Sequence, residues 1–145
     1  MPPPTPRILI IDDDPNCSEL IDLMLQYSGT EYEITCAQTP EEGLRLAATQ
    51  SFDLYLLDYR LPGVSGAEVC RTIRRMDAIT PVMFFTGAAH ERERREAMQA
   101  GANDYLIKPD DLGKLTGTVK RLTDASQPAA LSGITLAAYQ PEASA

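Results

Sequence analysis

Arg7-Ile-Leu-Ile-Ile-Asp-Asp-Asp-Pro15 is the stretch of sequence that decides the fold. Its first five residues are rich in isoleucine and apolar on both faces, which is typical of a buried strand in a parallel sheet. Asp14 and Pro15 then favour a helix start, because aspartate is a good N-cap and proline fits the first helical position. Apolar side chains at spacings of three and four predict the buried stripe of this helix: Cys17, Leu20, Ile21, Met24 and Tyr27.

The same alternation of an apolar run and a helical stretch occurs four more times along the chain. Further strands are expected at residues 33–37, 52–57, 81–85 and 104–107. Thr39-Pro-Glu-Glu42 and Ser65-Gly-Ala-Glu68 are capping boxes that start the second and third helices. The third helix is expected to bury Val69, Ile73 and Met76.

The last two helices have weaker signals. The fourth, at about residues 91–100, follows Gly87-Ala-Ala-His90, which contains no clear N-cap. The fifth is expected to be capped by Asp110 or Asp111. It also contains glycines, each of which costs about 1 kcal/mol relative to alanine in a helix, so we expect this helix to be short or mobile.

Five strands that alternate with helices predict an α/β fold, because each pair of parallel strands needs a crossover connection. We expect a doubly wound (βα)5 sandwich, in which a five-stranded parallel sheet carries helices on both faces. The chain of 145 residues is the size of one domain. We expect a proline-rich tail at residues 1–6, the domain at residues 7–124, and a C-terminal tail or linker at residues 125–145.

The net charge is −8, from 13 basic and 21 acidic residues. This charge disfavours direct binding to nucleic acid or to an anionic membrane, since both need a basic surface. No apolar run reaches the length of a membrane span, and the N-terminus does not resemble a secretory signal, so we expect a cytoplasmic location. Cys17, Cys36 and Cys70 lack the spacing of a metal site and are expected to be reduced and mostly buried.

Polar side chains follow four of the predicted strands, at the edge where an open parallel sheet binds its ligands. Asp12 and Asp13 follow the first strand, Asp58 the third, Thr86 the fourth and Lys108 the fifth. Clustered carboxylates repel one another unless a cation neutralises them, and this ligand set favours Mg²⁺ over zinc. The set suits phosphoryl transfer onto a carboxylate, because the metal and Lys108 offset negative charge while Thr86 donates a hydrogen bond.

From Arg7 to about Thr123, the chain resembles the receiver domains of bacterial two-component response regulators, the CheY-like superfamily. Four motifs carry the resemblance: Ile8-Leu-Ile-Ile-Asp-Asp-Asp-Pro15, Leu57-Asp-Tyr-Arg-Leu-Pro-Gly-Val-Ser-Gly66, Phe85-Thr-Gly87 and Gly101-Ala-Asn-Asp-Tyr-Leu-Ile-Lys-Pro109. The resemblance implies the strand order 2-1-3-4-5. It also implies that Asp58 is the phosphoacceptor and that Mg²⁺ binds Asp13, Asp58 and the backbone carbonyl of Arg60, with Asp12 acting through a water molecule.

The resemblance assigns the remaining roles at the strand ends. Lys108 matches the lysine that contacts the phosphoryl group, and Thr86 matches the switch hydroxyl. Thr86 is expected to turn toward the phosphoryl group and make room for Tyr105, the aromatic residue whose rotamer reports phosphorylation. Pro109 matches a structural proline preceded by a cis peptide bond.

The implied function is a signalling switch rather than an ordinary enzyme, although such domains assist their own phosphorylation and dephosphorylation. The implied partners are a sensor histidine kinase or phosphotransfer protein as donor, and a downstream protein or an output domain as target.

Two alternatives remain open. A phosphatase of the haloacid dehalogenase type would use Asp12 as its nucleophile, but Asn16 breaks that signature. A binding module that works without phosphorylation would keep the fold alone, and the full set of site residues argues against it.

Overall fold

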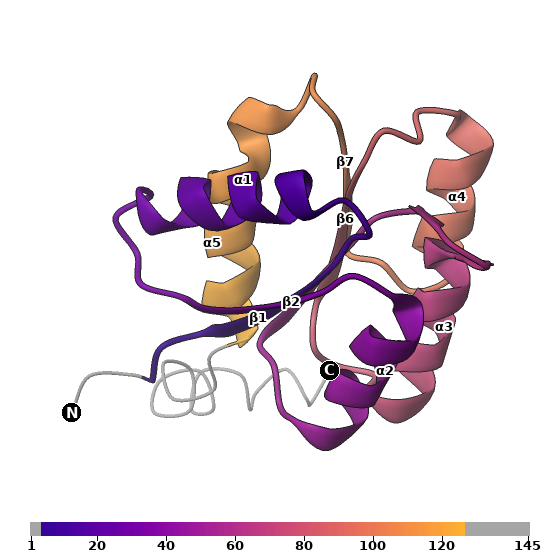
Figure 1. The fold of residues 1–145 in the computed structure, drawn as a ribbon, viewed down its shortest axis with the longest axis horizontal. Helices are drawn as coiled ribbons and strands as arrows, with labels where there is room; N and C mark the ends of the chain where they lie inside the picture. The colour runs from indigo at the N-terminus through magenta and orange to yellow at the C-terminus, as the bar shows by residue number, and fades with distance from the viewer. Residues whose placement is uncertain (1–3, 127–145) are drawn as a thin grey trace, which may run out of the picture.

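Within residues 4–126, which the computed structural model describes, five parallel strands form one sheet (Figure 1). In sheet order these strands are β2 (Glu33–Ala37), β1 (Arg7–Ile11), β3 (Leu54–Leu57), β6 (Val82–Thr86) and β7 (Asp104–Ile107). Two short strands, β4 (Arg60–Leu61) and β5 (Val64–Ser65), form a separate antiparallel ribbon that the sequence analysis did not predict. Because β6 and β7 are the fourth and fifth strands of the main sheet, the expected order 2-1-3-4-5 is confirmed.

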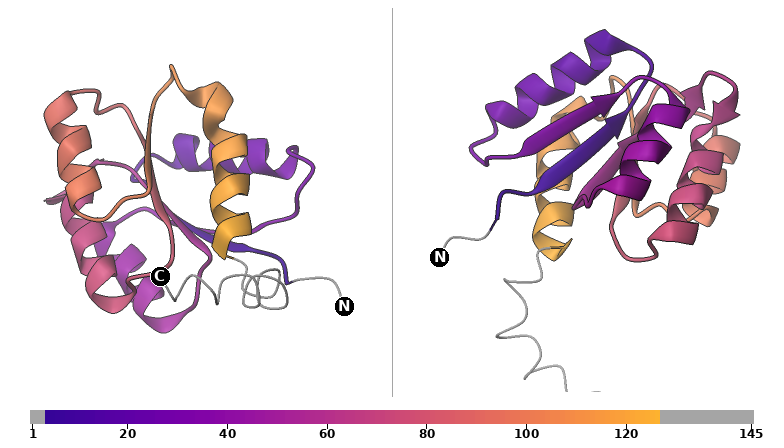
Figure 2. Two further views of the ribbon diagram at one scale, coloured as in Figure 1. Left: turned by 180° about the vertical axis from the view of Figure 1, so that it is seen from behind. Right: turned by 60° about the horizontal axis from the view of Figure 1, so that its bottom comes forward.

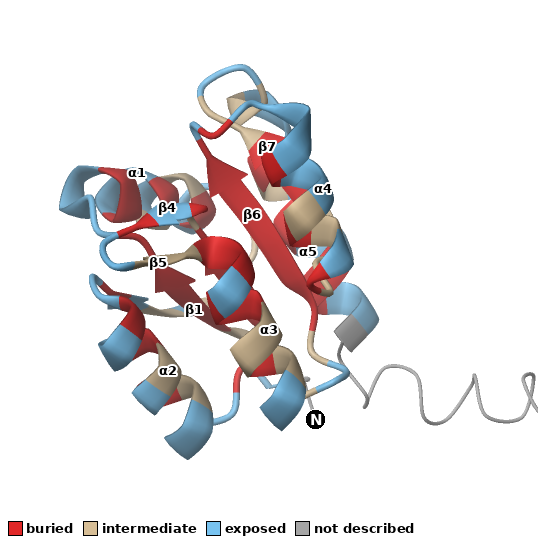
Figure 3. Cartoon of the chain, turned by 90° about the vertical axis from the view of Figure 1, so that its right-hand side faces the viewer, coloured by how far each residue is buried: buried red, intermediate tan, exposed pale blue. Residues whose placement is uncertain are grey.

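Helices cover both faces of the sheet, as the two views in Figure 2 show. The helices α1 (Pro15–Gln26) and α5 (Leu115–Ser126) lie on one face, and α2 (Pro40–Thr49), α3 (Gly66–Met76) and α4 (Glu91–Gln99) on the other. Each face has its own hydrophobic core, to which alternate residues of a strand contribute. β6 is buried along its whole length (Figure 3), as expected of a strand covered on both sides. The doubly wound α/β fold is therefore confirmed.

Three helices begin with the caps that the sequence predicts. Asp14 accepts a hydrogen bond from the backbone N–H of Asn16 at 2.9 Å, and Thr39 and Ser65 accept from the third helical residue at 3.1 and 3.2 Å. The sequence predicts no clear cap for α4, but the structure contains a capping bond there. There the carboxylate of Glu93, inside the helix, accepts from the backbone N–H of His90 at 3.2 Å.

The buried stripe of α1 differs from the predicted one. Its buried residues are Cys17, Ser18, Ile21 and Leu25. Leu20 is 43% exposed and Tyr27 is 82% exposed, so both assignments to the core were wrong. The stripe that faces the sheet advances in steps of four residues, which places Leu20 at its edge, and Tyr27 follows the last helical residue.

Three more residues, at or near the ends of helices and strands, differ from their expected placement. Met76, the last residue of α3, is 47% exposed rather than buried. Cys36 is exposed on the edge strand β2, whereas Cys17 and Cys70 are buried as expected. Asp111 does not cap its helix with its side chain; its carboxylate accepts from the backbone N–H of Ile107 at 2.9 Å.

The fifth helix is preceded by a 3-10 turn, η1 (Leu112–Lys114), and is not short: it contains 12 residues. It continues past residue 124, where the domain was expected to end. Residues 1–3 of the expected N-terminal tail and residues 127–145 of the expected C-terminal tail lie outside the described residues. None of the helices in residues 4–126 combines the length and the apolar content needed to cross a bilayer.

A close backbone approach joins the start of α3 to the end of β3. The backbone N–H of Gly66 donates to the carbonyl of Tyr59 at 2.5 Å. A Cβ atom at position 66 would lie 2.3 Å from the carbonyl oxygen of Asp58 and 2.8 Å from Cα of Tyr59. Glycine is therefore required here for space, and this requirement places α3 directly against the backbone of the site.

We expect Gly66→Ala to lower the free energy of unfolding by about 1–3 kcal/mol, because the added methyl group overpacks rigid backbone. Gly117→Ala is the matched control, since a Cβ atom there meets nothing within 4 Å and α5 gains up to about 1 kcal/mol from a better helix former. Denaturant unfolding measures both. Equal effects of the two substitutions would contradict the close packing at Gly66.

Candidate functional site

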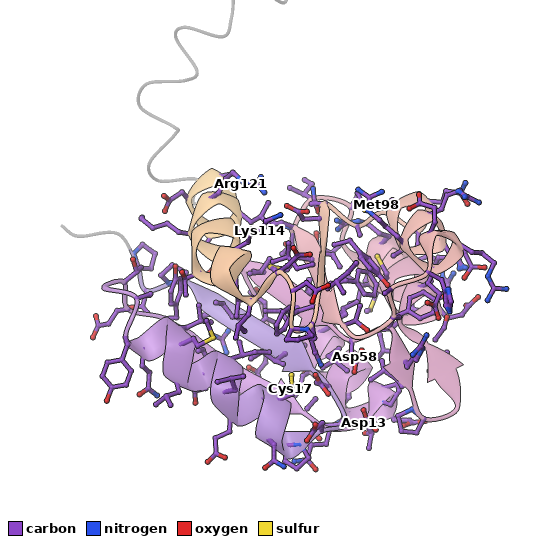
Figure 4. All side chains as sticks on the ribbon, turned by 90° about the horizontal axis from the view of Figure 1, so that it is seen from above. Asp13, Cys17, Asp58, Met98, Lys114 and Arg121 are labelled. Carbon is purple, nitrogen blue, oxygen red and sulfur yellow. The ribbon has the colours of Figure 1, made fainter. Side chains whose placement is uncertain are left out.

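The carboxyl ends of β1, β3, β6 and β7 meet at one edge of the sheet and bring the predicted site residues together. Figure 4 labels Asp13 and Asp58, which lie near each other on this side of the molecule, beside Cys17. One carboxylate oxygen from each of Asp12, Asp13 and Asp58 lies within 4.8 Å of the other two. Asp12 is 1% exposed, whereas Asp13 is open to solvent. An acidic cluster of this kind is typical of a site for a hard, oxygen-binding cation.

Lys108 supplies the positive charge of the site. Its Nζ atom lies 3.0 Å from Oδ2 of Asp12 and 3.8 Å from Oδ2 of Asp58. Burial lowers the pKa of Lys108, but hydrogen bonds with Cys17 and Asp12 and the charges of Asp58 and Asp12 outweigh burial, so the pKa is raised overall. Lys108 is therefore protonated at neutral pH. The peptide bond between Lys108 and Pro109 is cis.

Asp58 belongs to this cluster, and the protein's own groups offset only part of the cost of burying its negative charge. Burial raises its pKa, while the Thr86 hydrogen bond, the charge of Lys108 and the backbone N–H of Arg60 lower it; the net pKa lies above the usual aspartate value. The hydroxyl of Thr86 donates to Oδ1 of Asp58 at 2.5 Å. A cation beside Asp58 would stabilise the charged carboxylate further.

Thr86 is fully buried and also holds the neighbouring backbone. Its oxygen accepts from the backbone N–H groups of Tyr59 at 3.3 Å and Ala88 at 3.2 Å. One side chain thus connects the end of β3 to the loop that follows β6.

Tyr105 is 5% exposed, and its hydroxyl donates to the carbonyl of Ala88 at 2.6 Å. Its ring stacks on Phe84, with ring centroids 5.5 Å apart. Thr86 and Tyr105 thus both have their side chains inside the protein in this structure. The inward turn of these two side chains on phosphorylation stays a prediction.

Several neighbours of the site were missed by sequence reasoning. The thiol of Cys17 lies beside Lys108 and Asp12, and burial is the main reason that its pKa is raised to about 11. The side chains of Tyr59 and Arg60 reach α4, where they bind Glu96 and Glu93. The two residues of each pair are more than 30 positions apart in the sequence. Glu93 and Glu96 belong to none of the motifs, so only the tertiary structure reveals these bonds.

The family described as "Response regulator receiver domain" matches residues 8–120 of the chain. The chain belongs to this family. Receiver domains are signalling domains of two-component systems, and a phosphoacceptor role is general among them. The family assignment decides against a haloacid dehalogenase phosphatase.

The receiver domain is similar in sequence to curated regulatory proteins and in fold to solved receiver domains. The chain is 36% identical over 114 residues to the "Uncharacterized transcriptional regulatory protein YkoG" of Bacillus subtilis, covering 79% of this chain and 49% of that one. A CheY-like receiver domain protein from Methanospirillum hungatei aligns with a TM-score of 0.78 and 28% identity over 87% of this chain and 99% of that one. The regulator TrrA of Thermotoga maritima, solved with Mg²⁺ and BeF, aligns with a TM-score of 0.73 and 35% identity over 81% and 99%.

The two kinds of match differ in extent. The receiver domain spans about half or less of the length of the first curated relatives, but nearly all of the solved receiver structures. The similarity therefore concerns the receiver domain itself, and the activities of the longer regulators are not carried over with it.

We expect Mg²⁺ to stabilise the receiver domain, because a ligand that binds only the folded state shifts the unfolding equilibrium. The gain is about 1.4 kcal/mol at a concentration ten times the dissociation constant, and it is measured as a rise in melting temperature. Asp13→Asn should remove most of this rise. Asp14→Asn is the control, since asparagine preserves the helix cap and Asp14 is not one of the three clustered acids. An undiminished rise in Asp13→Asn would contradict the metal site.

Proposed function

We propose that this receiver domain accepts a phosphoryl group on Asp58 in a Mg²⁺-dependent reaction and changes conformation in response. The observation that carries the proposal is the position of Asp58, which is contacted by Thr86 and Lys108 and lies within 4.8 Å of two further carboxylates. A lone aspartate at a strand end is commonly a turn residue. A hydroxyl donor, an ammonium group and an acidic cluster around the same carboxylate favour phosphoryl transfer instead.

The donor set suits magnesium, since all the oxygens within reach are hard ligands. Asp13, Asp58 and the backbone carbonyl of Arg60 would hold the ion directly. Asp12 would act through water, which agrees with its engagement elsewhere: one of its oxygens binds Lys108 at 3.0 Å and the other accepts from the backbone N–H of Asp14 at 2.9 Å. When bound, Mg²⁺ offsets the repulsion between the carboxylates and the oxygens of the incoming phosphoryl group.

The reaction is a transfer between two nucleophiles. A carboxylate oxygen of Asp58 forms a new bond to phosphorus, and the bond from phosphorus to the donor breaks with its electron pair remaining on the donor. The donor is a phosphohistidine of a sensor kinase or of a phosphotransfer protein. The hydroxyl of Thr86 and the ammonium group of Lys108 then donate to phosphoryl oxygens, so that charge is stabilised by groups already in place.

The output of the switch depends on a downstream protein or an output domain. Several relatives are named as transcriptional regulators, and this chain covers only part of their length. The acidic charge of the chain disfavours contact with DNA by the receiver domain itself. Signal transfer through a protein surface is therefore the proposed mode of action.

The phosphoacceptor is tested with acetyl phosphate and Mg²⁺. The wild-type domain should gain one phosphoryl group that is labile to base, and Asp58→Asn should gain none, as measured by intact mass. Asp14→Asn should be labelled at the wild-type rate. Labelling of Asp58→Asn at that same rate would sink the assignment, and absence of labelling in the wild type would favour a binding module that works without phosphorylation.

Thr86→Ala should still accept phosphate but lose much of the conformational response. A hydrogen bond to a charged acceptor contributes about 1.5–3 kcal/mol, and the part of it that Thr86 gains only on phosphorylation shifts the balance between the two states. Amide hydrogen exchange of residues 87–107, with and without beryllofluoride as phosphoryl mimic, measures the response. Thr86→Ser keeps the hydroxyl and is expected to respond like the wild type. A full response in Thr86→Ala would show that the threonine serves only the backbone.

A further inference from the structure

The two residues that follow Asp58 are attached to α4 by side-chain bonds of their own. The guanidinium group of Arg60 contacts both carboxylate oxygens of Glu93 at 3.1 to 3.3 Å. The hydroxyl of Tyr59 donates to the carboxylate of Glu96, one turn further along the helix. Neither bond involves Thr86 or Tyr105, so they form a separate connection between the end of β3 and α4.

Glu93 is the central group of this connection. Its side chain is 9% exposed, whereas that of Arg60 is 59% exposed. The same carboxylate that binds Arg60 also accepts from the backbone N–H of His90 and so completes the start of α4. An ion pair between two exposed groups contributes little, but a buried carboxylate loses much when its partner is removed, because its charge is left uncompensated.

The other end of the connection is the backbone of Arg60. Its N–H stabilises the charged form of the Asp58 carboxylate, and its carbonyl is the third metal ligand in the proposed function. Tyr59 and Leu61, on either side of Arg60, are buried in the core, whereas the Arg60 side chain is exposed and bonds to Glu93. The ion pair with Glu93 therefore adds a link from the Arg60 segment to α4 beyond the core packing of its neighbours.

We propose that Glu93 is a positioning residue for the phosphoacceptor site: it holds Arg60 through the ion pair and thereby couples occupancy of the site to the start of α4. The proposal rests on the proposed function, since it assumes a metal and a phosphoryl group at Asp58. Coupling of this kind is reciprocal. Loss of the ion pair should weaken magnesium binding, and binding at the site should protect the start of α4.

Glu93→Gln tests the proposal, because glutamine keeps the size and the acceptor for His90 but removes the charge that binds Arg60. The magnesium concentration for half-maximal labelling by acetyl phosphate should rise about threefold to tenfold, within the range for residues that share one ion-pair network. Protection of residues 88–97 from amide exchange by Mg²⁺ and beryllofluoride should fall at the same time.

Glu91→Gln is the matched control. Glu91 lies in the same first turn of α4, but it is exposed, and within residues 4–126 its ion pair is with Arg94, at 4.0 Å. The substitution Glu91→Gln should leave both the magnesium requirement and the amide-exchange protection at wild-type values. Arg60→Met removes the exposed partner of the Arg60–Glu93 ion pair. It should raise the magnesium concentration needed for labelling as Glu93→Gln does. The double variant should show little further change, because both substitutions break the same bond.

The outcomes separate the two proposals. If wild-type protein is not labelled on Asp58, the proposed function fails. If it is labelled and Glu93→Gln behaves like Glu91→Gln in both readouts, the connection through Glu93 fails while the phosphoacceptor stands. Additive effects of Arg60→Met and Glu93→Gln would likewise overturn the connection, since they would act through separate contacts.

Discussion

Lys108 and Asp12 form an ion pair at 3.0 Å, although 96 positions separate them in the sequence. The pair reaches from the end of β7 to the end of β1, across the two strands that lie between them in the sheet. Three carboxylates at one edge repel one another, and Lys108 is the protein cation that contacts two of them. With one ammonium group against three carboxylates, the site keeps a net negative charge, which favours the binding of a further cation.

A rigid sheet holds these charges in place. β1, β3 and β6 are buried on both faces, so the ends of these strands have little freedom to move apart. Gly66 adds a backbone contact between α3 and the residues around Asp58 that no larger side chain permits. The strand ends that carry Asp12, Asp58 and Thr86 are thus positioned by packing, which favours a site that is preorganised.

By contrast, α4 is attached to the site mainly through polar bonds. Thr86 and Tyr105 bind the Ala88 backbone ahead of α4, and Glu93 and Glu96 bind the residues next to Asp58. Hydrogen bonds and ion pairs depend strongly on geometry and charge, whereas apolar contacts do not. We therefore expect a change of charge at Asp58 to act most directly on α4.

By itself, the sequence determined the fold class, the strand order by resemblance, and the five residues at the strand ends, because strand and helix periodicity and caps such as Asp14 are local properties. It misplaced Leu20, Tyr27 and Met76, since the exact face that a helix buries depends on how it rotates against the sheet. It also missed the contacts of Cys17 and Glu93. Only the tertiary structure decided these, because bonds between Arg60 and Glu93 exist only after the chain has brought distant elements together.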